Sequence, residues 1–223
     1  MSAPLRDPAI LRRALRLYVL VETSDIGLAA LRGGATALQL RAKSAGGAAL
    51  FAAARELALA CAARGALLVV NDRLDVALAS GAGGVHLGQD DLPVSAARAV
   101  AGPGFIIGAS AGTPDEARRA ERDGADYLGA GSVNRTCSKE DAGPPIGLTG
   151  LAGVIEATRL PVVAIGGIDA DSAPRVVAAG AAGVAVISAV VARPDVAAAA
   201  ADLRAAVDKA LRGAAPGGRG TGS

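Results

Sequence analysis

Residues 67–91 read LLVVNDRLDVALASGAGGVHLGQDD, and this stretch contains the unit from which the fold is built. An apolar run at Leu67–Asn71 and a second at Val85–Gly88 flank a segment of helical character that ends near a Gly-Gly pair. Both runs are continuous rather than alternating with polar residues, which is typical of parallel strands covered on both faces. The stretch therefore predicts a strand, a helix and a parallel strand, with polar side chains just past the strand ends.

The same pattern recurs along the chain, which has eight apolar runs with segments of helical composition between them. Helical composition is clearest at Gly46–Arg64 and at Pro194–Leu211, which are rich in alanine and leucine. Residues Thr113–Glu116 combine a capping box with proline at the first helical position, which predicts a helix start. A Gly-Gly or Gly-Ala pair, which favours a helix end, precedes four of the runs, at Gly33-Gly34, Gly83-Gly84, Gly124-Ala125 and Gly180-Ala181.

Eight strands alternating with helices in 223 residues fit a single-domain α/β fold, the TIM (β/α)8 barrel, better than an open doubly wound sheet. The open sheet stays as the alternative because closure cannot be read from a sequence. We expect the barrel to occupy residues 1–211 and residues 212–223, which lack apolar anchors, to form a disordered tail. The expected strands are Leu17–Val21, Ala37–Arg41, Leu67–Asn71, Val85–Gly88, Phe105–Ala109, Tyr127–Gly131, Val162–Ile165 and Val184–Ile187.

The composition argues against several classes of partner. A net charge of +2, two Tyr, two Phe and no Trp leave little for nucleic acid to bind or stack on. No run reaches the roughly 18 apolar residues that a membrane span needs, and the N-terminus lacks the apolar core of a secretory signal. We therefore expect a soluble, cytoplasmic protein in which Cys61 and Cys137 are reduced and structurally incidental.

A cluster of donors follows the second expected strand, at Gln39, Arg41 and Lys43. Alternate residues of an extended chain share one side, so an amide, a guanidinium and an ammonium point the same way. Three donors with no carboxylate between them suit a multiply charged anion. The alternative is a solvated positive edge.

Carboxylates follow the third and fourth expected strands, at Asp72 and Asp91. Magnesium diphosphate sites use one or two protein carboxylates, and phosphate oxygens complete the metal's shell. Each carboxylate has a structural alternative: Asp72 can cap a helix or pair with Arg73, and Asp91 can cap a helix that begins near Pro93. Taken together, the two favour a metal site.

The remaining strand ends also carry polar groups. Ser110 has a hydroxyl suited to phosphate, and the polar loop after the sixth strand places Thr136, Ser138 and Lys139 close together. After the seventh and eighth strands, where TIM barrels commonly bind phosphate, come a Gly-Gly pair and Ser188. His86, the only histidine, lies within a strand, and we interpret it as packed and hydrogen-bonded rather than as an acid or base.

These segments together resemble the thiamine-phosphate synthase family. The resemblance covers roughly residues 15–190 and rests on eight motifs: QLRAK at 39–43, NDR at 71–73, HLGQDD at 86–91, GASA at 108–111, TCSK at 136–139, GPPIGL at 143–148, AIGGI at 164–168 and VISA at 186–189. It implies Mg2+-dependent coupling of 4-amino-2-methyl-5-(diphosphooxymethyl)pyrimidine with 4-methyl-5-(2-phosphooxyethyl)thiazole. The products are thiamine phosphate and diphosphate, and the implied reaction is dissociative, with a pyrimidine methylene cation.

The resemblance also implies which residues do this. One Mg2+ per subunit is held by Asp72 and Asp91, and the residues assigned to catalysis are Arg41, Lys43, Ser110 and Lys139. The implied pyrimidine diphosphate site is Gln39, Leu40, Arg41, Ala42, Lys43, Asn71, Ser110 and Lys139. The implied thiazole phosphate site is Thr136, Cys137, Ser138, Gly167, Ile187 and Ser188.

The chain departs from the family pattern at a few positions. Ala42 replaces an acidic residue, Ser138 replaces a threonine, and Asn134-Arg135 replaces an aromatic-proline pair. Gly112 stands where many relatives have a histidine. The resemblance implies that the related thiazole tautomerase uses a histidine in this loop after the fifth strand, so Gly112 disfavours that isomerase as the function. A non-catalytic phosphate-binding barrel is a second alternative. The sequence does not determine whether the protein forms a homo-oligomer, and it gives Glu22 no role.

Overall fold

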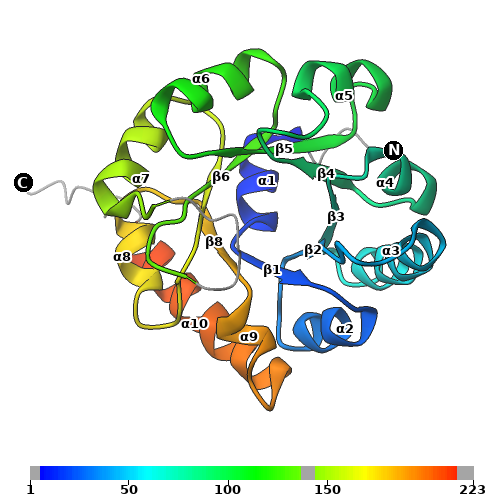
Figure 1. Ribbon diagram of the computed structural model, residues 1–223. Helices are drawn as coiled ribbons and strands as arrows, with labels where there is room; N and C mark the ends of the chain where they lie inside the picture. The colour runs from blue at the N-terminus through cyan, green and yellow to red at the C-terminus, as the bar shows by residue number, and fades with distance from the viewer. Residues whose placement is uncertain (1–5, 137–143, 215–223) are drawn as a thin grey trace, which may run out of the picture.

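The fold is a closed barrel of eight parallel strands (Figure 1). It is seen in a computed structural model that describes residues 6–136 and 144–214. Each strand pairs with the next along the chain, and β8 pairs with β1, so the TIM barrel is confirmed and the open sheet is wrong. The strands are β1 Leu17–Val21, β2 Ala37–Leu40, β3 Leu67–Asn71, β4 Gly84–Leu87, β5 Ile106–Ala111, β6 Tyr127–Ala130, β7 Val162–Ile165 and β8 Gly183–Val186.

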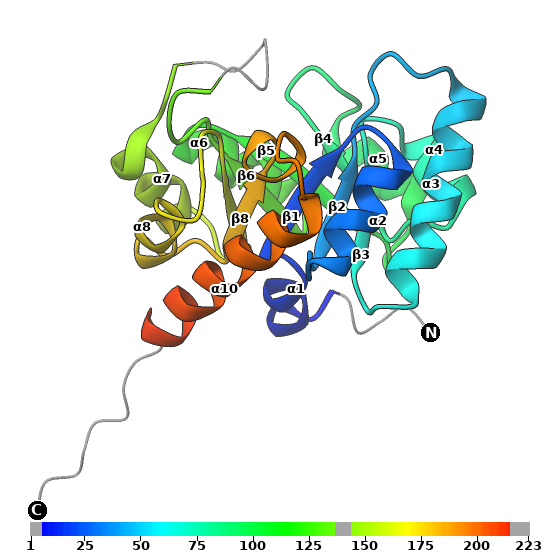
Figure 2. The same cartoon turned by 90° about the horizontal axis from the view of Figure 1, so that it is seen from below.

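Helices surround this barrel on the outside, and one lies at the end where the strands begin (Figure 2). None of the helices in the described ranges is long and apolar enough to span a membrane. The helices are α1 Pro8–Ala14, α2 Ser24–Arg32, α3 Gly47–Ala62, α4 Leu74–Ser80, α5 Val94–Ala101, α6 Pro114–Arg122, α7 Gly147–Glu156, α8 Ala173–Ala178, α9 Ser188–Val191 and α10 Val196–Ala214.

The expected helices are present with small changes in their bounds. The predicted capping box at the start of α6 forms, because the Thr113 side chain accepts from the Glu116 N–H and the Glu116 side chain caps in return. Helix α10 continues to Ala214, so the expected boundary at residue 211 falls inside a helix. The rest of the expected tail, residues 215–223, lies outside the described residues. Cys61 is a buried, free thiol on α3.

The strands are apolar throughout because each is buried on two sides. In β1, Leu17 and Val19 belong to the large cluster between the strands and the helices. The alternate residues Tyr18 and Leu20 belong to a second cluster inside the barrel. Successive side chains of a strand point to opposite faces, so a strand with helices outside and a packed interior has no polar face.

The helix α1 closes the barrel at the end where the strands begin, and the sequence pattern did not predict it. The Asp7 carboxylate caps the helix by accepting from the N–H groups of Ala9 and Ile10. Leu11 and Leu15, with 1% and 0% exposure, pack into the interior cluster. The Asp-Pro pair at residues 7–8 was the available sequence signal, because aspartate favours the cap and proline the first turn.

We expect Leu15→Ala to lower the free energy of unfolding by about 2–5 kcal/mol, because it leaves a cavity in the packed end of the barrel. Chemical denaturation measures the change. The matched control is Leu59→Ala, at a side chain that is 70% exposed on α3, where we expect a change within about 0.5 kcal/mol. Equal losses in both variants would contradict the closing role of α1.

One of the four Gly-Gly or Gly-Ala pairs, Gly83-Gly84, has a different role from the one expected. Helix α4 ends at Gly81, which takes the left-handed conformation with φ 78°, and not at Gly83-Gly84. Gly84 instead opens β4, where a Cβ would lie 2.6 Å from the carbonyl oxygen of Ile106. The second glycine of the pair is therefore needed for the close approach of β4 to β5.

Candidate active site

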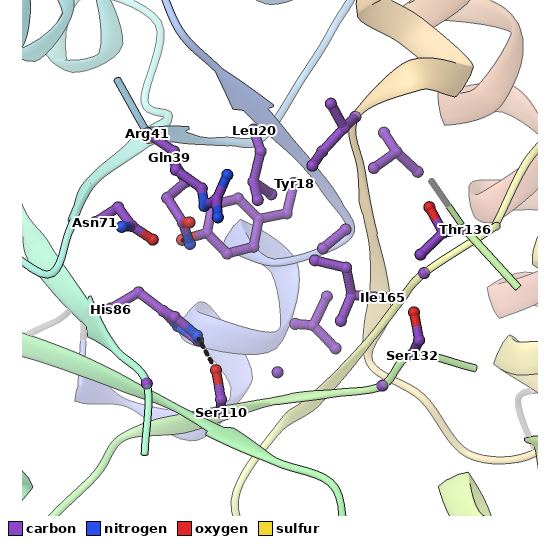
Figure 3. Close-up of a pocket in the computed structure, with 18 of the residues that line it drawn as sticks. Tyr18, Leu20, Gln39, Arg41, Asn71, His86, Ser110, Ser132, Thr136 and Ile165 are labelled. Carbon is purple, nitrogen blue, oxygen red and sulfur yellow. Dashed lines mark hydrogen bonds between the residues drawn. The ribbon is translucent and has the colours of Figure 1, made fainter. Parts of the chain in front are cut away.

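A cavity of about 590 Å3 opens at the carboxyl ends of the strands and collects most of the predicted site residues. Figure 3 shows Gln39, Arg41 and Asn71 on one side of it and Ser132 and Thr136 on the other. Eleven predicted residues line the cavity: Gln39, Arg41, Lys43, Asn71, Asp72, Asp91, Ser110, Thr136, Gly167, Ile187 and Ser188. Three further predicted residues, Cys137, Ser138 and Lys139, lie outside the described residues.

The end of β2 divides its residues between the cavity and the core. Gln39, Arg41 and Lys43 line the cavity, as the alternation of an extended chain predicts. The intervening Leu40 and Ala42 pack instead against the cluster between strands and helices, and Leu40 is fully buried. The structure thus does not bring the side chains of Leu40 and Ala42 to the cavity, although both belong to the predicted binding segment.

Asp72 sits at the end of β3 in an unusual backbone conformation. It is the only residue other than glycine, within the described ranges, with a positive φ, which is 60°. Its N–H donates to the carbonyl oxygen of His86 at 2.9 Å, which ties this turn to β4. Such a conformation costs about 1–3 kcal/mol and is found most often at functional sites.

Neither structural alternative for Asp72 holds. The residue that precedes α4 is Arg73, and no side chain caps that helix. The Arg73 guanidinium pairs with Asp75, through bonds of 2.8 and 2.6 Å, rather than with Asp72. Asp72 instead lines the cavity.

Asp91 likewise does not cap the helix that follows it. The residue before α5 is Pro93, and α5 has no side-chain cap. The Asp91 Oδ2 atom accepts instead from the Gly88 N–H at 2.6 Å, which folds the loop after β4 back on itself. A Cβ at Gly88 would lie 2.9 Å from that oxygen, so glycine suits this close approach.

The two carboxylates are neighbours, and their proximity changes the acidity of Asp72. Burial, together with the hydrogen bond and the charge of Asp91, raises the pKa of Asp72 to about 6, while Lys43 and Arg41 oppose the shift. A divalent cation between the two oxygens would relieve this repulsion. The described residues contain no cluster of three or more His, Cys, Asp or Glu side chains able to hold a metal, so the donor set fits Mg2+ only with water or phosphate oxygens added.

The opposite side of the cavity is built around Gly166 and Gly167, which follow β7 with φ 101° and 60°. The loop after β6 packs directly on them: Asn134 Nδ2 donates to the Gly167 carbonyl oxygen at 2.9 Å, and the Asn134 N–H donates to that of Gly166 at 3.0 Å. A Cβ at Gly167 would lie 2.5 Å from the Arg135 carbonyl oxygen. The departure at Asn134-Arg135 therefore contributes one side-chain hydrogen bond, from Asn134, to this side of the cavity.

Several cavity residues were missed or only partly understood from the sequence. His86 is hydrogen-bonded, as predicted, to Ser110 Oγ and to the Tyr127 hydroxyl, each at 3.1 Å, but it also lines the cavity. Tyr18 lines it from inside β1. Ser110 lies within β5, which ends at Ala111, two residues later than predicted. The only available signal for Tyr18 was that a phenol stands within an otherwise aliphatic run.

Comparison with known proteins identifies the family. The family model described as thiamine monophosphate synthase matches residues 20–190. The chain is 52% identical over 202 residues to the thiamine-phosphate synthase of Moorella thermoacetica, covering 87% of this chain and 96% of that protein. It is 53% identical over 185 residues to the thiamine-phosphate synthase of Methanocella arvoryzae, covering 83% and 87%.

The solved structures agree. Thiamine phosphate pyrophosphorylase from Pyrococcus furiosus superposes with a TM-score of 0.85 at 45% sequence identity, over 90% of this chain and 99% of that one. A 3-hexulose-6-phosphate synthase, at 20% identity and a TM-score of 0.65, shares the fold alone. By the match to its model and by these relatives, the chain belongs to the thiamine monophosphate synthase family.

Proposed function

We propose that this protein joins 4-amino-2-methyl-5-(diphosphooxymethyl)pyrimidine to 4-methyl-5-(2-phosphooxyethyl)thiazole, giving thiamine phosphate and diphosphate. One observation carries the proposal: a single cavity has two carboxylates beside Arg41 and Lys43 at one side and a glycine turn with Ser188 at the other. The first arrangement suits a metal diphosphate and the second a monophosphate. The two phosphorylated substrates of this reaction need those two subsites.

In this reaction the protein has mainly to position the two substrates and to stabilise the charge of the leaving diphosphate. The bond between the pyrimidine methylene carbon and the diphosphate oxygen breaks, and its electron pair leaves with the diphosphate. The lone pair of the thiazole nitrogen then forms the new bond to that carbon, so the positive charge ends on the thiazolium. Arg41 and Lys43 line the cavity where they would stabilise the leaving diphosphate, and Lys139 is the third cation of the proposed set.

The metal fits the same half of the site. Asp72 and Asp91 would hold Mg2+, with the substrate's own oxygens and water as the other ligands. When bound, the ion would neutralise charge on the diphosphate as it leaves. The side chains around it keep the diphosphate facing the reacting carbon, which converts an encounter of two substrates into a positioned reaction.

The related isomerase activity is disfavoured by the loop after β5. The resemblance implies that the related thiazole tautomerase uses a histidine there, and this chain has Gly112. The nearby Glu116 carboxylate is engaged in the helix cap, where it accepts from the N–H groups of Gly112 and Thr113 at 2.6 and 3.2 Å. The transferase reaction requires no base at this position because the attacking nitrogen carries no proton.

Incubation of the purified protein with both substrates and Mg2+ tests the proposal. We expect thiamine phosphate in equal amount to the diphosphate released, measured by mass spectrometry and by a diphosphate assay. Addition of a chelator should stop both. Binding of both substrates without any product would overturn the proposed reaction and favour a non-catalytic phosphate-binding barrel.

A further inference from the structure

A chain of hydrogen-bonded side chains crosses the barrel beneath the cavity. The Gln39 Nε2 atom donates to the Tyr18 hydroxyl at 2.9 Å, and the Tyr18 and Tyr127 hydroxyls are 2.9 Å apart. The Tyr127 hydroxyl lies 3.1 Å from Nδ1 of His86, and Nε2 of His86 lies 3.1 Å from Ser110 Oγ. Five side chains from β1, β2, β4, β5 and β6 are thereby joined in one line, which we call the relay.

Counting protons gives the relay a direction. The Tyr18 oxygen accepts from Gln39, so its own proton is available to the Tyr127 oxygen. Tyr127 can then donate to Nδ1 of His86. A neutral imidazole that accepts at Nδ1 carries its proton on Nε2, which donates to Ser110. The Ser110 hydroxyl proton is left to donate to a ligand, and Gln39 keeps its Oε1 atom as an acceptor at the other end.

The surroundings hold the relay in place. Tyr18 and Tyr127 are buried, and burial raises the pKa of both, so each keeps its proton. The two rings pack edge to face with centroids 6.0 Å apart. A Cβ at Gly108 would overlap the Tyr127 ring and hydroxyl, and a Cβ at Gly129 would lie 3.1 Å from Cε1 of His86. The backbone therefore leaves room for these rings at positions where any other residue would displace them.

Both ends of the relay reach the same cavity, because Gln39 and Ser110 line it. We propose that Tyr18, Tyr127 and His86 are positioning residues that make Ser110 a donor and Gln39 an acceptor, so that the site selects a 4-aminopyrimidine over its 4-oxo counterpart. A 4-aminopyrimidine offers an amino N–H beside a bare ring nitrogen, which matches one acceptor and one donor. A 4-oxopyrimidine offers a carbonyl beside a ring N–H, which is the reverse. This inference rests on the proposed function for the identity of the ring.

Reversal of the relay has a cost at every member. For Ser110 to accept from a ligand N–H, it must donate to Nε2, His86 must carry its proton on Nδ1, both tyrosine protons must turn, and the Gln39 amide must flip. The five groups of the neutral relay therefore change together, and a mismatched ring leaves buried polar groups unpaired. A protonated imidazole reverses only the side of the relay with the tyrosines and Gln39, because Nδ1 then donates to Tyr127 while Nε2 still donates to Ser110.

The first experiment reads the direction of the relay without any ligand. His86 is the only histidine, so protein labelled with 15N-histidine gives one pair of ring nitrogen resonances. We expect the neutral Nε2–H form in the wild type. Tyr127→Phe should give a mixture of the two neutral forms, because Nδ1 loses its donor. The Nδ1–H or doubly protonated form in the wild type would overturn the proposal.

The second experiment measures selection. Dissociation constants for the 4-amino and 4-oxo pyrimidine diphosphates are determined with Mg2+ and without the thiazole. We expect the wild type to favour the amino compound by about 100-fold or more, and Tyr127→Phe and Tyr18→Phe each to reduce that ratio by about 10-fold. Ser80→Ala, which removes another buried hydroxyl, is the control and should leave the ratio unchanged.

The outcomes separate the two claims. No thiamine phosphate from the wild type would overturn the proposed function, while the histidine resonances would still test the relay. Product formation with the same selection ratio in the wild type and in both tyrosine variants would overturn the relay alone. A general loss of packing would weaken both diphosphates equally and would not move the ratio, so an equal loss also counts against the proposal.

Discussion

Replacement of Asp72 by asparagine should lower the rate of thiamine phosphate formation by about 100-fold or more, because the change removes a carboxylate that we propose binds the metal beside the leaving diphosphate. The variant changes the charge of this side chain and little else. Asparagine has the size of aspartate and, like it, tolerates the left-handed conformation that residue 72 adopts at φ 60°. The loss should therefore come with a higher Mg2+ concentration at half-maximal rate and little change in folding.

Asp75→Asn is the matched control for this experiment. Asp75 lies three residues further along, is exposed, and pairs with Arg73 rather than with the cavity. Steady-state rates over a Mg2+ series should be nearly unchanged in that variant. Equal activity and equal Mg2+ dependence of Asp72→Asn and the wild type would mean that the metal is held elsewhere.

Gly167→Ala should lower kcat/KM for the thiazole phosphate by about 100-fold. The residue has φ 60°, and a Cβ there would lie 2.5 Å from the Arg135 carbonyl oxygen and 2.9 Å from the Asn134 Cβ. The backbone that we propose binds the monophosphate must therefore shift, and a misplacement of this size costs much of the benefit of orientation. We expect most of this loss to come from a higher KM for the thiazole phosphate rather than from a lower kcat.

Gly65→Ala is the control, and it separates the effect of backbone strain at a positive φ from the effect of disturbing the cavity. Gly65 has φ 65°, close to that of Gly167, but a Cβ there would meet nothing within 4 Å, and the residue precedes β3 at the other end of the barrel. Gly65→Ala should lose stability and keep its KM values. Weaker binding of the pyrimidine diphosphate in Gly167→Ala, with the thiazole KM unchanged, would contradict the division of the cavity into two halves.

The sequence predicts a side chain's position best where that position depends only on neighbouring residues in the chain. Arg41 and Lys43 follow a strand at alternate positions, so their shared side could be predicted from the two-residue period alone. The same period places Leu40 on the opposite side of the strand, although the predicted binding segment, residues 39–43, includes it. Only the packing of Leu40 against the outer core shows that its side chain serves the fold.

The local sequence determined the eight strand-helix units, the helix starts and the charged groups at the strand ends, because periodicity and capping act over a few residues. Tertiary structure alone decided barrel closure between β8 and β1, the sealing of its end by α1, and the joining of Tyr18 to Tyr127 across 109 positions of the chain. Those features depend on groups that are distant in sequence and meet only when the sheet closes. The relay from Gln39 to Ser110 is one of these features.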